Sequence, residues 1–314
     1  MAIANFTGDG QPTKDEQLLC STGFTAGLHG HLTFVSVLNS FLSVTAFLGN
    51  ALILVALRRE SSLHPPSKLL LRSLATTDLF VGLISEPLAV TYWMSEVNEH
   101  WNICRLVLPA DLFIGSILCG VSLWTMTAIS VNRLLALLLG LRYKQVVTLN
   151  RTYVIIVTIW IVSTVISAMQ FWNPVITLWY WIIVIPLCLV TSVFSYTKIF
   201  LTLRHHQNQV QGHVQQPNQT NQLNIARYKK AVSSAIWLQL TLVACYLPYG
   251  VIVTLWTIVP SSTVYHSWIY TASLVYLNSS LNPILYCWKM EEVRRAVKST
   301  IRQVLCYCFP TKIL

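Results

Sequence analysis

The stretch from Leu106 to Tyr143 constrains the fold of this chain more than any other. It is apolar almost throughout as far as Leu139, and the pair Asn132-Arg133 interrupts it near its far end. A helix of about 20 apolar residues covers the ~30 Å hydrocarbon core of a bilayer. We therefore predict a transmembrane helix here, in which Arg133 reaches either the membrane interface or polar groups on neighbouring helices.

Further apolar segments of similar length predict a polytopic membrane protein. Hydrophobic residues make up 54% of the chain and charged residues 10%, whereas a soluble domain carries about a quarter charged residues. Apolar runs of this length must be helical, because lipid satisfies no backbone polar groups. We predict an all-α bundle of seven transmembrane helices followed by a short amphipathic eighth helix. The segments lie at 32–57, 68–94, 106–139, 152–172, 177–203, 229–259 and 264–288.

The distribution of Lys and Arg predicts the orientation. Alternate connectors and the C-terminal tail are rich in both residues, and the opposite side has only Lys14 and Arg105. Because such connectors stay in the cytoplasm, we expect a plasma-membrane protein with its N-terminus outside. Three parts follow: an extracellular N-terminus (1–30), a seven-helix domain (31–288) and a cytoplasmic amphipathic helix with tail (289–314). The same distribution accounts for the net charge of +10 without a nucleic-acid partner.

Two kinds of covalent modification are expected. Asn5-Phe-Thr is a glycosylation sequon on the predicted outer face. After the seventh segment, apolar residues recur at three- and four-residue steps among basic ones, which predicts an amphipathic helix on the inner leaflet. Cys306 and Cys308 at its end are candidates for S-acylation, and two unmodified thiols are the alternative.

Polar residues within the predicted spans suggest an internal cluster. Asp78 lies in the middle of the second span, where an unpaired carboxylate is costly. Other spans carry polar residues at comparable depth: Asn50, Ser122, Asn278, Ser279 and Asn282. They predict either a hydrogen-bonded network or a small cation site around Asp78. Pro248 and Pro283 mark helix bends next to polar residues, and such bends allow two packings of similar energy.

The chain resembles the rhodopsin-like (class A) G-protein-coupled receptors over most of residues 32–305. The resemblance depends on motifs that follow the family's order along the seven segments. They are Gly49-Asn50, Leu74-Ala75 with Asp78, Ser122 with Asn132-Arg133, Trp160, CYLP at 245–248 and NSSLNPILY at 278–286. Each motif is weak alone, and the collinear set is specific.

This resemblance implies a receptor that passes an extracellular signal to a heterotrimeric G protein when the sixth helix moves outward. Arg133 would hold the inactive state and then meet the G protein, and Leu141 would dock on it. Arrestin and membrane lipid are the further implied partners. Tyr246 would lie beneath the ligand, and Tyr196 and Tyr286 would belong to the activation machinery. A sodium ion, the only cofactor implied, would be held in the inactive state by Asp78, Ser122, Asn278 and Asn282.

The chain departs from the family at its predicted cytoplasmic side. The family's Asp-Arg-Tyr is Asn132-Arg133-Leu134 here, and Tyr228-Lys229-Lys230 stands where an acidic residue often begins the sixth helix. Without these anions the inactive state should be less favoured, so we expect basal activity. In the fifth segment Pro186 precedes Tyr196 by more residues than is usual.

A second departure concerns the disulfide of the outer face. Most members tie the third helix to the second extracellular loop, but the loop here, expected at 171–177, contains no cysteine. Cys104 is in place at the third helix, and Cys20 is the only other cysteine of the predicted outer face. The resemblance therefore implies a Cys20–Cys104 bridge.

The resemblance does not identify the ligand. The LRYKQVVT stretch is similar to adenosine receptors, yet their ligand-binding positions fall on Val253 and Tyr276. The short second loop is similar to melanocortin receptors. The amine-binding aspartate of amine receptors falls on Gly115 when counted from Arg133, and on Asp111 when counted from Cys104.

Two acids nevertheless suggest a cationic ligand. Glu86, just before Pro87, and Asp111 could line an outer pocket with the aromatic residues Tyr92, Trp101, Tyr249, Trp256, Tyr270 and Tyr276. An amine, a basic peptide or a bridging divalent ion would suit such a pocket. The alternatives are a protonated, hydrogen-bonded Glu86 and a solvated Asp111.

A multi-pass transporter of a small solute is the alternative function. It predicts internal repeats and broken helices in corresponding halves, and the sequence has no such repeat. A membrane enzyme would need a His or metal constellation at membrane depth, and His64, His205, His206 and His213 all fall in predicted connectors. We therefore predict that the protein is not an enzyme.

Overall fold

The computed structural model describes residues 20, 27–59, 64–213, 219–259, 261–289 and 291–308, and it confirms the predicted all-α class. Within these ranges the regular elements are helices and none is a strand. In chain order they are α3 (His29–Arg59), α4 (Pro65–Phe80), η1 (Val81–Ser85), α5 (Glu86–Val97), α6 (Trp101–Leu139), η2 (Gly140–Arg142), α7 (Tyr143–Val146), α8 (Leu149–Ala168), η3 (Met169–Phe171), α9 (Pro174–His213), α10 (Gln219–Ile258), α11 (Ser262–Lys289) and α12 (Glu291–Cys308).

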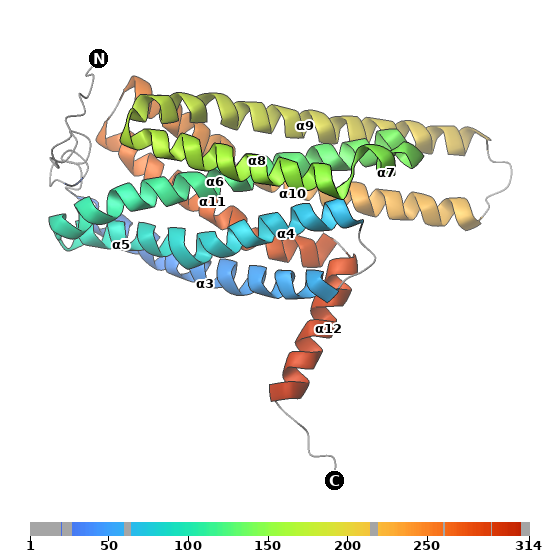
Figure 1. Cartoon of the computed structure of the whole chain (residues 1–314), viewed down its shortest axis with the longest axis horizontal. Helices are drawn as coiled ribbons and strands as arrows, with labels where there is room; N and C mark the ends of the chain where they lie inside the picture. The colour runs from blue at the N-terminus through green and yellow to red at the C-terminus, as the bar shows by residue number, and fades with distance from the viewer. Residues whose placement is uncertain are drawn as a thin grey trace, which may run out of the picture.

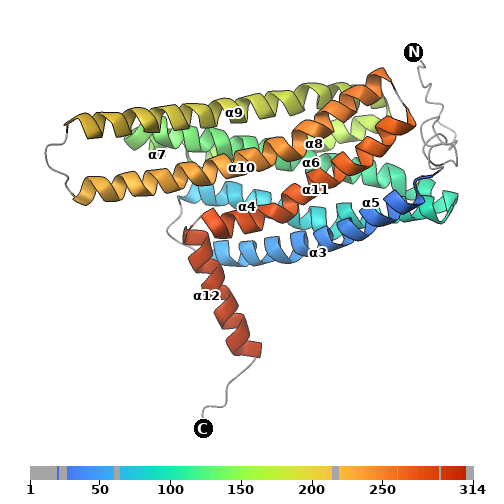
Figure 2. The ribbon, with the colours of Figure 1, turned by 180° about the vertical axis from the view of Figure 1, so that it is seen from behind.

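The helices α3, α4 with α5, α6, α8, α9, α10 and α11 run along the long axis of the molecule, and α12 projects across it (Figures 1 and 2). Among the described residues, six spans are long and apolar enough to cross a membrane: α3, α4 through α5, α6, α8 with η3, and parts of α9 and α10. The seventh, α11, is less apolar because Asn and Ser interrupt its middle. It still packs in the bundle, against α10 and α3.

The two ends of the bundle differ, and we call them the disulfide end and the α12 end. At the disulfide end the Cys20 and Cys104 sulfurs are bonded, with their Cα atoms 5.9 Å apart. Both cysteines are buried in an apolar cluster with Leu28 and Leu32. The bond therefore fastens a residue that precedes α3 to the start of α6. The sequon at Asn5 lies outside the described residues.

The connection from α8 to α9 at the same end is shorter than the sequence suggested. The short helix η3 follows α8 directly, and α9 already begins at Pro174 rather than near 177. Its first turn is stabilised locally, because the Asn173 side-chain oxygen accepts a hydrogen bond from the Val175 N–H at 3.1 Å. So short a connection leaves little chain to cover the bundle at this end.

The second span contains a π-helical segment, η1, directly before Glu86. The Glu86 N–H bonds to the Val81 carbonyl five residues earlier, which inserts one extra residue into the turn. Pro87 follows, and its ring prevents an ordinary helical hydrogen bond at this point. The wider turn accommodates the proline and sets the direction in which Glu86 points.

The same segment packs closely against α3, and this approach requires a glycine. A Cβ added to Gly82 would lie 2.7 Å from the Phe47 nitrogen and from the Ser43 carbonyl oxygen. The Ser43 hydroxyl donates a hydrogen bond of 2.6 Å to the Gly82 carbonyl. The first two spans are thus held in backbone contact.

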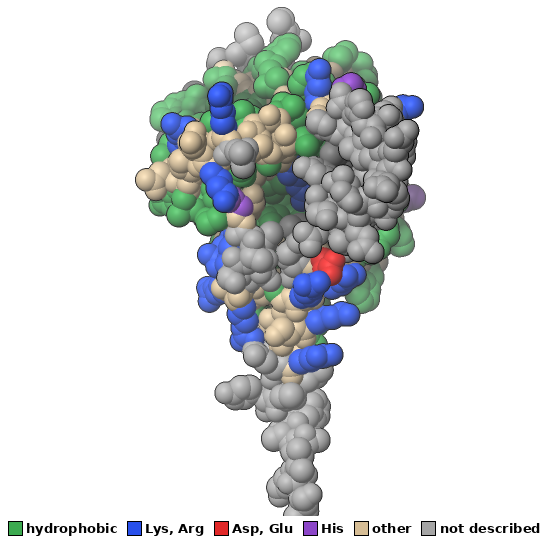
Figure 3. All heavy atoms as spheres, turned by 90° about the vertical axis from the view of Figure 1, so that its right-hand side faces the viewer, with side chains coloured by type: hydrophobic (Ala, Val, Ile, Leu, Met, Phe, Trp, Pro, Cys, Tyr) green, Lys and Arg blue, Asp and Glu red, His purple; other side chains and the backbone are tan. Residues whose placement is uncertain are grey.

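Helix α12 carries an apolar face and a basic face, as predicted. Val293 and Val297 are buried in the core cluster, and α12 packs on α3. Arg295 forms an ion pair with Glu291 one turn earlier. Lys and Arg predominate among the charged side chains of the described part of the α12 end (Figure 3). Cys306 and Cys308 fall in the last turn of α12, and their side chains lie outside the described ones.

Candidate functional site

The Asp78 carboxylate is the centre of a polar cluster in the middle of the bundle. Its side chain is fully buried. Oδ1 accepts hydrogen bonds from the Ser279 hydroxyl at 2.8 Å and the Ser122 hydroxyl at 3.4 Å, and Oδ2 accepts one from the Asn282 amide at 2.7 Å. These bonds join α4, α6 and α11. The sequence predicted this convergence, and Ser279 takes a larger part in it than the resemblance implied.

Two other asparagines lie around this cluster without bonding to the Asp78 carboxylate. The Asn278 amide nitrogen donates to the Met126 sulfur at 3.4 Å. The Asn50 amide nitrogen donates to the carbonyls of Ala46, at 2.8 Å, and Ser279, at 3.1 Å. The side-chain oxygens of Asn50, Asn278 and Asn282 are buried without a hydrogen-bond partner in the described part of the chain.

This donor set fits a small, hard cation. One carboxylate, two hydroxyls and amide oxygens without protein partners are the oxygen ligands that such a cation prefers. Asp78, Ser122 and Asn282, which the sequence singled out, supply ligands that are already close together. Asn278 could contribute only its side-chain oxygen, since its amide nitrogen is directed at Met126.

Toward the disulfide end, two buried acids have carboxylate oxygens without hydrogen-bond partners among the described residues. Glu86 is fully buried, and neither of its carboxylate oxygens has a hydrogen-bond partner among the described residues. Asp111 is 6% exposed, and its Oδ1 likewise has no hydrogen-bond partner among the described residues. Tyr276 lies beside Ser85, the residue before Glu86, and beside Gly115, which is about one helical turn from Asp111. These contacts bring the second span, α6 and α11 together near the two acids.

Gly115 lies against Ser85 and Tyr276 in this region. A Cβ built on Gly115 would be 3.4 Å from the Ser85 hydroxyl and 3.9 Å from the Tyr276 hydroxyl. The Ser85 hydroxyl in turn donates to Tyr276 at 3.4 Å. The position to which one of the two counts assigned the amine-binding aspartate thus carries no side chain and lies next to Ser85 and Tyr276. Asp111, the position given by the other count, supplies the carboxylate.

The α10 residues of the predicted pocket line its deeper side. Tyr246 is 1% exposed and belongs to the main apolar core with Leu242 and Cys245. Val253 is buried on the same helix two turns further on, and Tyr249 packs between them, half-buried. Tyr246 therefore belongs to the apolar core of the bundle, and Tyr249 packs against the same core.

A third acid, Glu96, was not singled out by the sequence analysis. The Tyr265 hydroxyl lies 2.8 Å and 2.9 Å from the two Glu96 carboxylate oxygens, and Tyr92 donates to the same carboxylate at 2.9 Å. Tyr92 is thus occupied here rather than beside Glu86. Tyr270, another expected pocket residue, is 40% exposed and bonds to His31 at 2.6 Å.

At the α12 end, Asn132 does not act as a neutral copy of a family aspartate that holds the neighbouring arginine. Its amide nitrogen donates to the Ser67 hydroxyl at 3.0 Å, and its side-chain oxygen accepts from Tyr143 at 2.9 Å. Tyr143 and Ser67 are also 3.4 Å apart. This triad links α6, α4 and α7, and it fixes the helical turn that follows Leu141.

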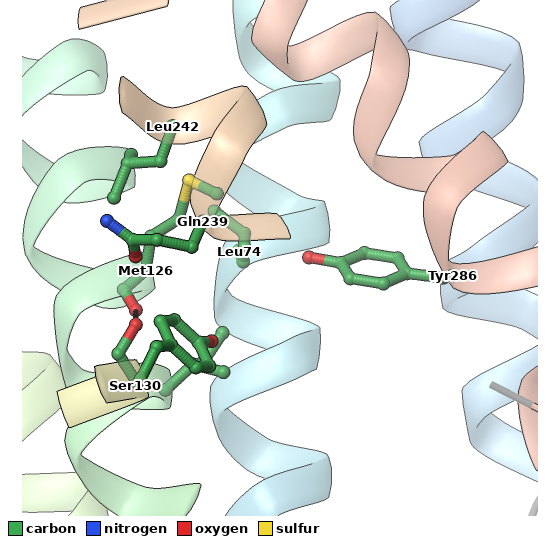
Figure 4. A pocket seen from close by; sticks show the side chains of 8 residues that line it. Leu74, Met126, Ser130, Gln239, Leu242 and Tyr286 are labelled. Atoms are coloured by element: carbon green, nitrogen blue, oxygen red, sulfur yellow. Dashed lines mark hydrogen bonds between the residues drawn. The ribbon is translucent and has the colours of Figure 1, made fainter. Parts of the chain in front are cut away.

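The described side chains of the activation motifs lie around a small cavity near this end. Tyr286 points from α11 into the space between α4, α6 and α10 (Figure 4). Tyr196 lines the same cavity from α9, although Pro186 is further away along the helix than the family pattern suggests. Pro248 and Pro283 lie inside α10 and α11. Tyr196 and Tyr286, which come from different motifs, are therefore neighbours in space.

A membrane bundle of helices with a polar centre and two buried acids near one end has the architecture of a membrane receptor. The family described as 7 transmembrane receptor (rhodopsin family) matches residues 49–175 and 170–286. The chain therefore belongs to the rhodopsin-like, class A, G-protein-coupled receptors, and it is a receptor rather than an enzyme.

Individual relatives agree with this assignment. Melanocortin receptor 4 of Danio rerio is 23% identical over 303 residues, which cover 91% of this chain and 88% of the relative. Melanocortin receptor 5 of Mus musculus is 26% identical over 273 residues, covering 83% and 82%. The alpha-2B adrenergic receptor of Rattus norvegicus is 31% identical over 156 residues, covering 50% of this chain and 32% of the relative.

Proposed function

We propose that this receptor binds a cationic ligand between Glu86 and Asp111 and activates a heterotrimeric G protein. The observation that carries the proposal is that both Glu86 carboxylate oxygens and the Asp111 Oδ1 are buried without a hydrogen-bond partner among the described residues. Buried acids are costly unless they are paired or neutralised, so a positively charged group from outside would gain strong interactions there. Tyr249 and Tyr276 add aromatic surface for an ammonium or guanidinium group.

The charge and position of Glu86 and Asp111 indicate the class of ligand, whereas the names of the relatives do not. Those relatives are named as melanocortin and alpha-2B adrenergic receptors, so their names point to different ligands. A basic peptide or an amine suits two acids on facing helices, and a divalent ion bridging ligand and receptor is a variant of the same binding mode. The short connection between α8 and α9 would leave this region open to a ligand approaching from the disulfide end.

The proposed orientation puts the disulfide end outside the plasma membrane and the α12 end in the cytoplasm. It is supported by the Lys and Arg of the α12 end. In this orientation α12 lies at the inner leaflet, where its basic face would contact acidic lipid and Cys306 and Cys308 could be acylated. A glycan would be attached at Asn5 outside.

Activation would pass through the residues between the two ends. Ligand contact near Tyr246 would shift α10 about the bend at Pro248, and the α12-end half of α10 would move outward. Tyr286 and Tyr196 would then rearrange around their shared cavity, and Arg133 and Leu141 would meet the G protein or arrestin. A sodium ion at the Asp78 cluster would favour the closed packing, because it binds between helices that separate on activation.

Basal activity is part of the proposal. Asn132 is engaged with Ser67 and Tyr143 and carries no charge, so it cannot restrain Arg133 electrostatically as a carboxylate would. We expect ligand-free G-protein activation in cells, measured across the G-protein families at matched surface expression. Arg133→Ala should abolish the signal. A wild-type signal no higher than that of Arg133→Ala would contradict basal activity.

The ligand site has its own experiment. A panel of amines and basic peptides is screened on the wild type and on Glu86→Gln and Asp111→Asn. The proposal expects a hit that loses at least tenfold in potency in either variant, as expected when one of two buried charges is left unpaired. A hit with unchanged potency in both variants would place the ligand elsewhere.

A further inference from the structure

Gln239 is a polar side chain in an otherwise apolar part of the sixth span. It is 8% exposed, and neither its side-chain oxygen nor its nitrogen has a hydrogen-bond partner among the described residues. The neighbouring Leu240 is 54% exposed and faces the lipid, so α10 turns the amide inward. The cost of burying such a group is only offset when its bonds are made.

Gln239 lines, from α10, the cavity that Tyr286 lines from α11 (Figure 4). The Tyr286 hydroxyl is also buried without a partner in the described structure. Ser130, which lines the cavity from α6, already donates to the Met126 carbonyl at 2.9 Å. Leu74, Met126, Ile129 and Leu242 form the apolar part of the lining.

The cavity is too small to satisfy the amide. Its volume is about 10 Å³, which is roughly the space that one water molecule needs. A carboxamide offers two donors and an oxygen that can accept two bonds. Even with a water bound, most of the hydrogen-bonding capacity of Gln239 therefore stays unused while the helices are packed as they are here.

We infer that Gln239 weakens the closed packing and thereby sets how readily the sixth span opens. Gln239 lies about two and a half turns before Pro248, on the part of α10 that the bend would swing outward. Opening would admit water to the cavity and complete the hydrogen bonds of both Gln239 and Tyr286. A polar group that is better satisfied in the open state shifts the equilibrium toward that state.

This inference depends on the α10 movement of the proposed function, and its test is Gln239→Leu. A leucine side chain has no unmade hydrogen bonds in the closed cavity, and water that enters on opening would not stabilise it. Ligand-free G-protein activation should therefore fall about three- to tenfold at equal surface expression, the range expected when one net hydrogen bond no longer favours opening. Gln239→Met, which introduces an apolar side chain of a different shape, should lower the ligand-free signal as well. Thr241→Val is the matched control on the same helix, since the Thr241 hydroxyl already bonds to the Trp237 carbonyl at 2.9 Å, and it should leave the signal unchanged.

A second readout separates this inference from the proposed function. The thermal midpoint of the purified, ligand-free receptor should rise in Gln239→Leu and not in Thr241→Val. If wild type gives no more signal than Arg133→Ala, the receptor has no basal activity. The thermal midpoint alone then tests the inference about Gln239. An unchanged or higher basal signal in Gln239→Leu would overturn the inference, and so would an unchanged or lower midpoint.

Discussion

The Tyr143 hydroxyl donates a 2.9 Å hydrogen bond to the side-chain oxygen of Asn132, which joins the short helix α7 to the end of α6. Both groups are neutral and buried, and Ser67 on α4 completes the triad. In the family pattern a carboxylate occupies the Asn132 position. The structure thus keeps a polar link at this position while removing the negative charge from the neighbour of Arg133.

Restoring a negative charge at position 132 should lower the basal activity of the receptor. Asn132→Asp can still accept from Tyr143 and from the Ser67 hydroxyl, and it adds an anion next to Arg133. Hydrogen bonds to charged groups are worth about 1.5–3 kcal/mol, so ligand-free G-protein activation should fall roughly tenfold. Asn150→Asp adds the same charge at an exposed site on α8 and serves as the control. Equal signals in Asn132→Asp and wild type would show that the lost carboxylate does not cause basal activity.

Removing the Tyr143 hydroxyl should loosen α7. Tyr143→Phe leaves the Asn132 oxygen without its donor, at an expected cost of about 1 kcal/mol. Coupling to the G protein should weaken, because Leu141 would be held less firmly, while ligand affinity should stay unchanged. Tyr153→Phe is the matched control, since Tyr153 is 61% exposed. Normal activation by Tyr143→Phe would mean that the link to α7 is dispensable for coupling.

Asp78→Asn should remove the response to sodium. Wild type should have a higher thermal midpoint and a lower ligand-free signal in sodium chloride than in an organic-cation chloride at the same ionic strength. The variant should show neither difference, because an amide lacks the negative charge that the cation needs. If the variant and wild type respond alike, the cation binds elsewhere; if neither responds, the donor set around Asp78 is a structural network.

The Glu96 cluster should contribute to stability more than its position near a helix end suggests. Glu96→Gln weakens the bonds from Tyr92 and Tyr265, and we expect a loss of about 1–3 kcal/mol, seen as a lower thermal midpoint. Glu99→Gln changes the same group three residues further on, at an exposed site, and should be nearly neutral. Similar midpoints for the two variants would mean that the buried bonds add little.

Breaking the disulfide should lower stability without abolishing the fold. The bridge spans a sequence separation of 84, and such bonds typically contribute about 2–5 kcal/mol. Cys20→Ser, Cys104→Ser and the double variant should share one lowered midpoint, because each removes the same bond. A double variant clearly less stable than both single ones would indicate that the cysteines act separately.

The elements that could be predicted from sequence are those governed by local composition. Long apolar runs determine the spans, and intramembrane polar residues such as Asp78 and Asn282 find one another because lipid offers no alternative partner. Among the described residues, six spans are long and apolar enough to cross a membrane. The seventh, α11, was assigned by its NSSLNPILY motif as well, since the polar residues that make it functional also lower its hydrophobicity.

The residues missed were those whose partners come from distant parts of the chain. Glu96 and Tyr92 share a helix face at a spacing of four residues, which was a usable signal. Tyr265, which completes their cluster, could only be found from the structure. Tyr143 lay in a predicted connector, where a buried hydroxyl was not expected. Gln239 is the one amide of the sixth apolar segment, 229–259, and an amide in such a segment is a usable signal.

The π-helical segment before Glu86 also affects how this receptor can be compared with others. One extra residue in a turn rotates everything that follows by about 100° relative to an ordinary helix. Positions counted from Asp78 toward the disulfide end without allowing for it are assigned to the wrong side of the second span. Pairing pocket residues between this chain and a relative therefore requires a gap at Val81–Ser85 wherever the relative lacks the extra residue.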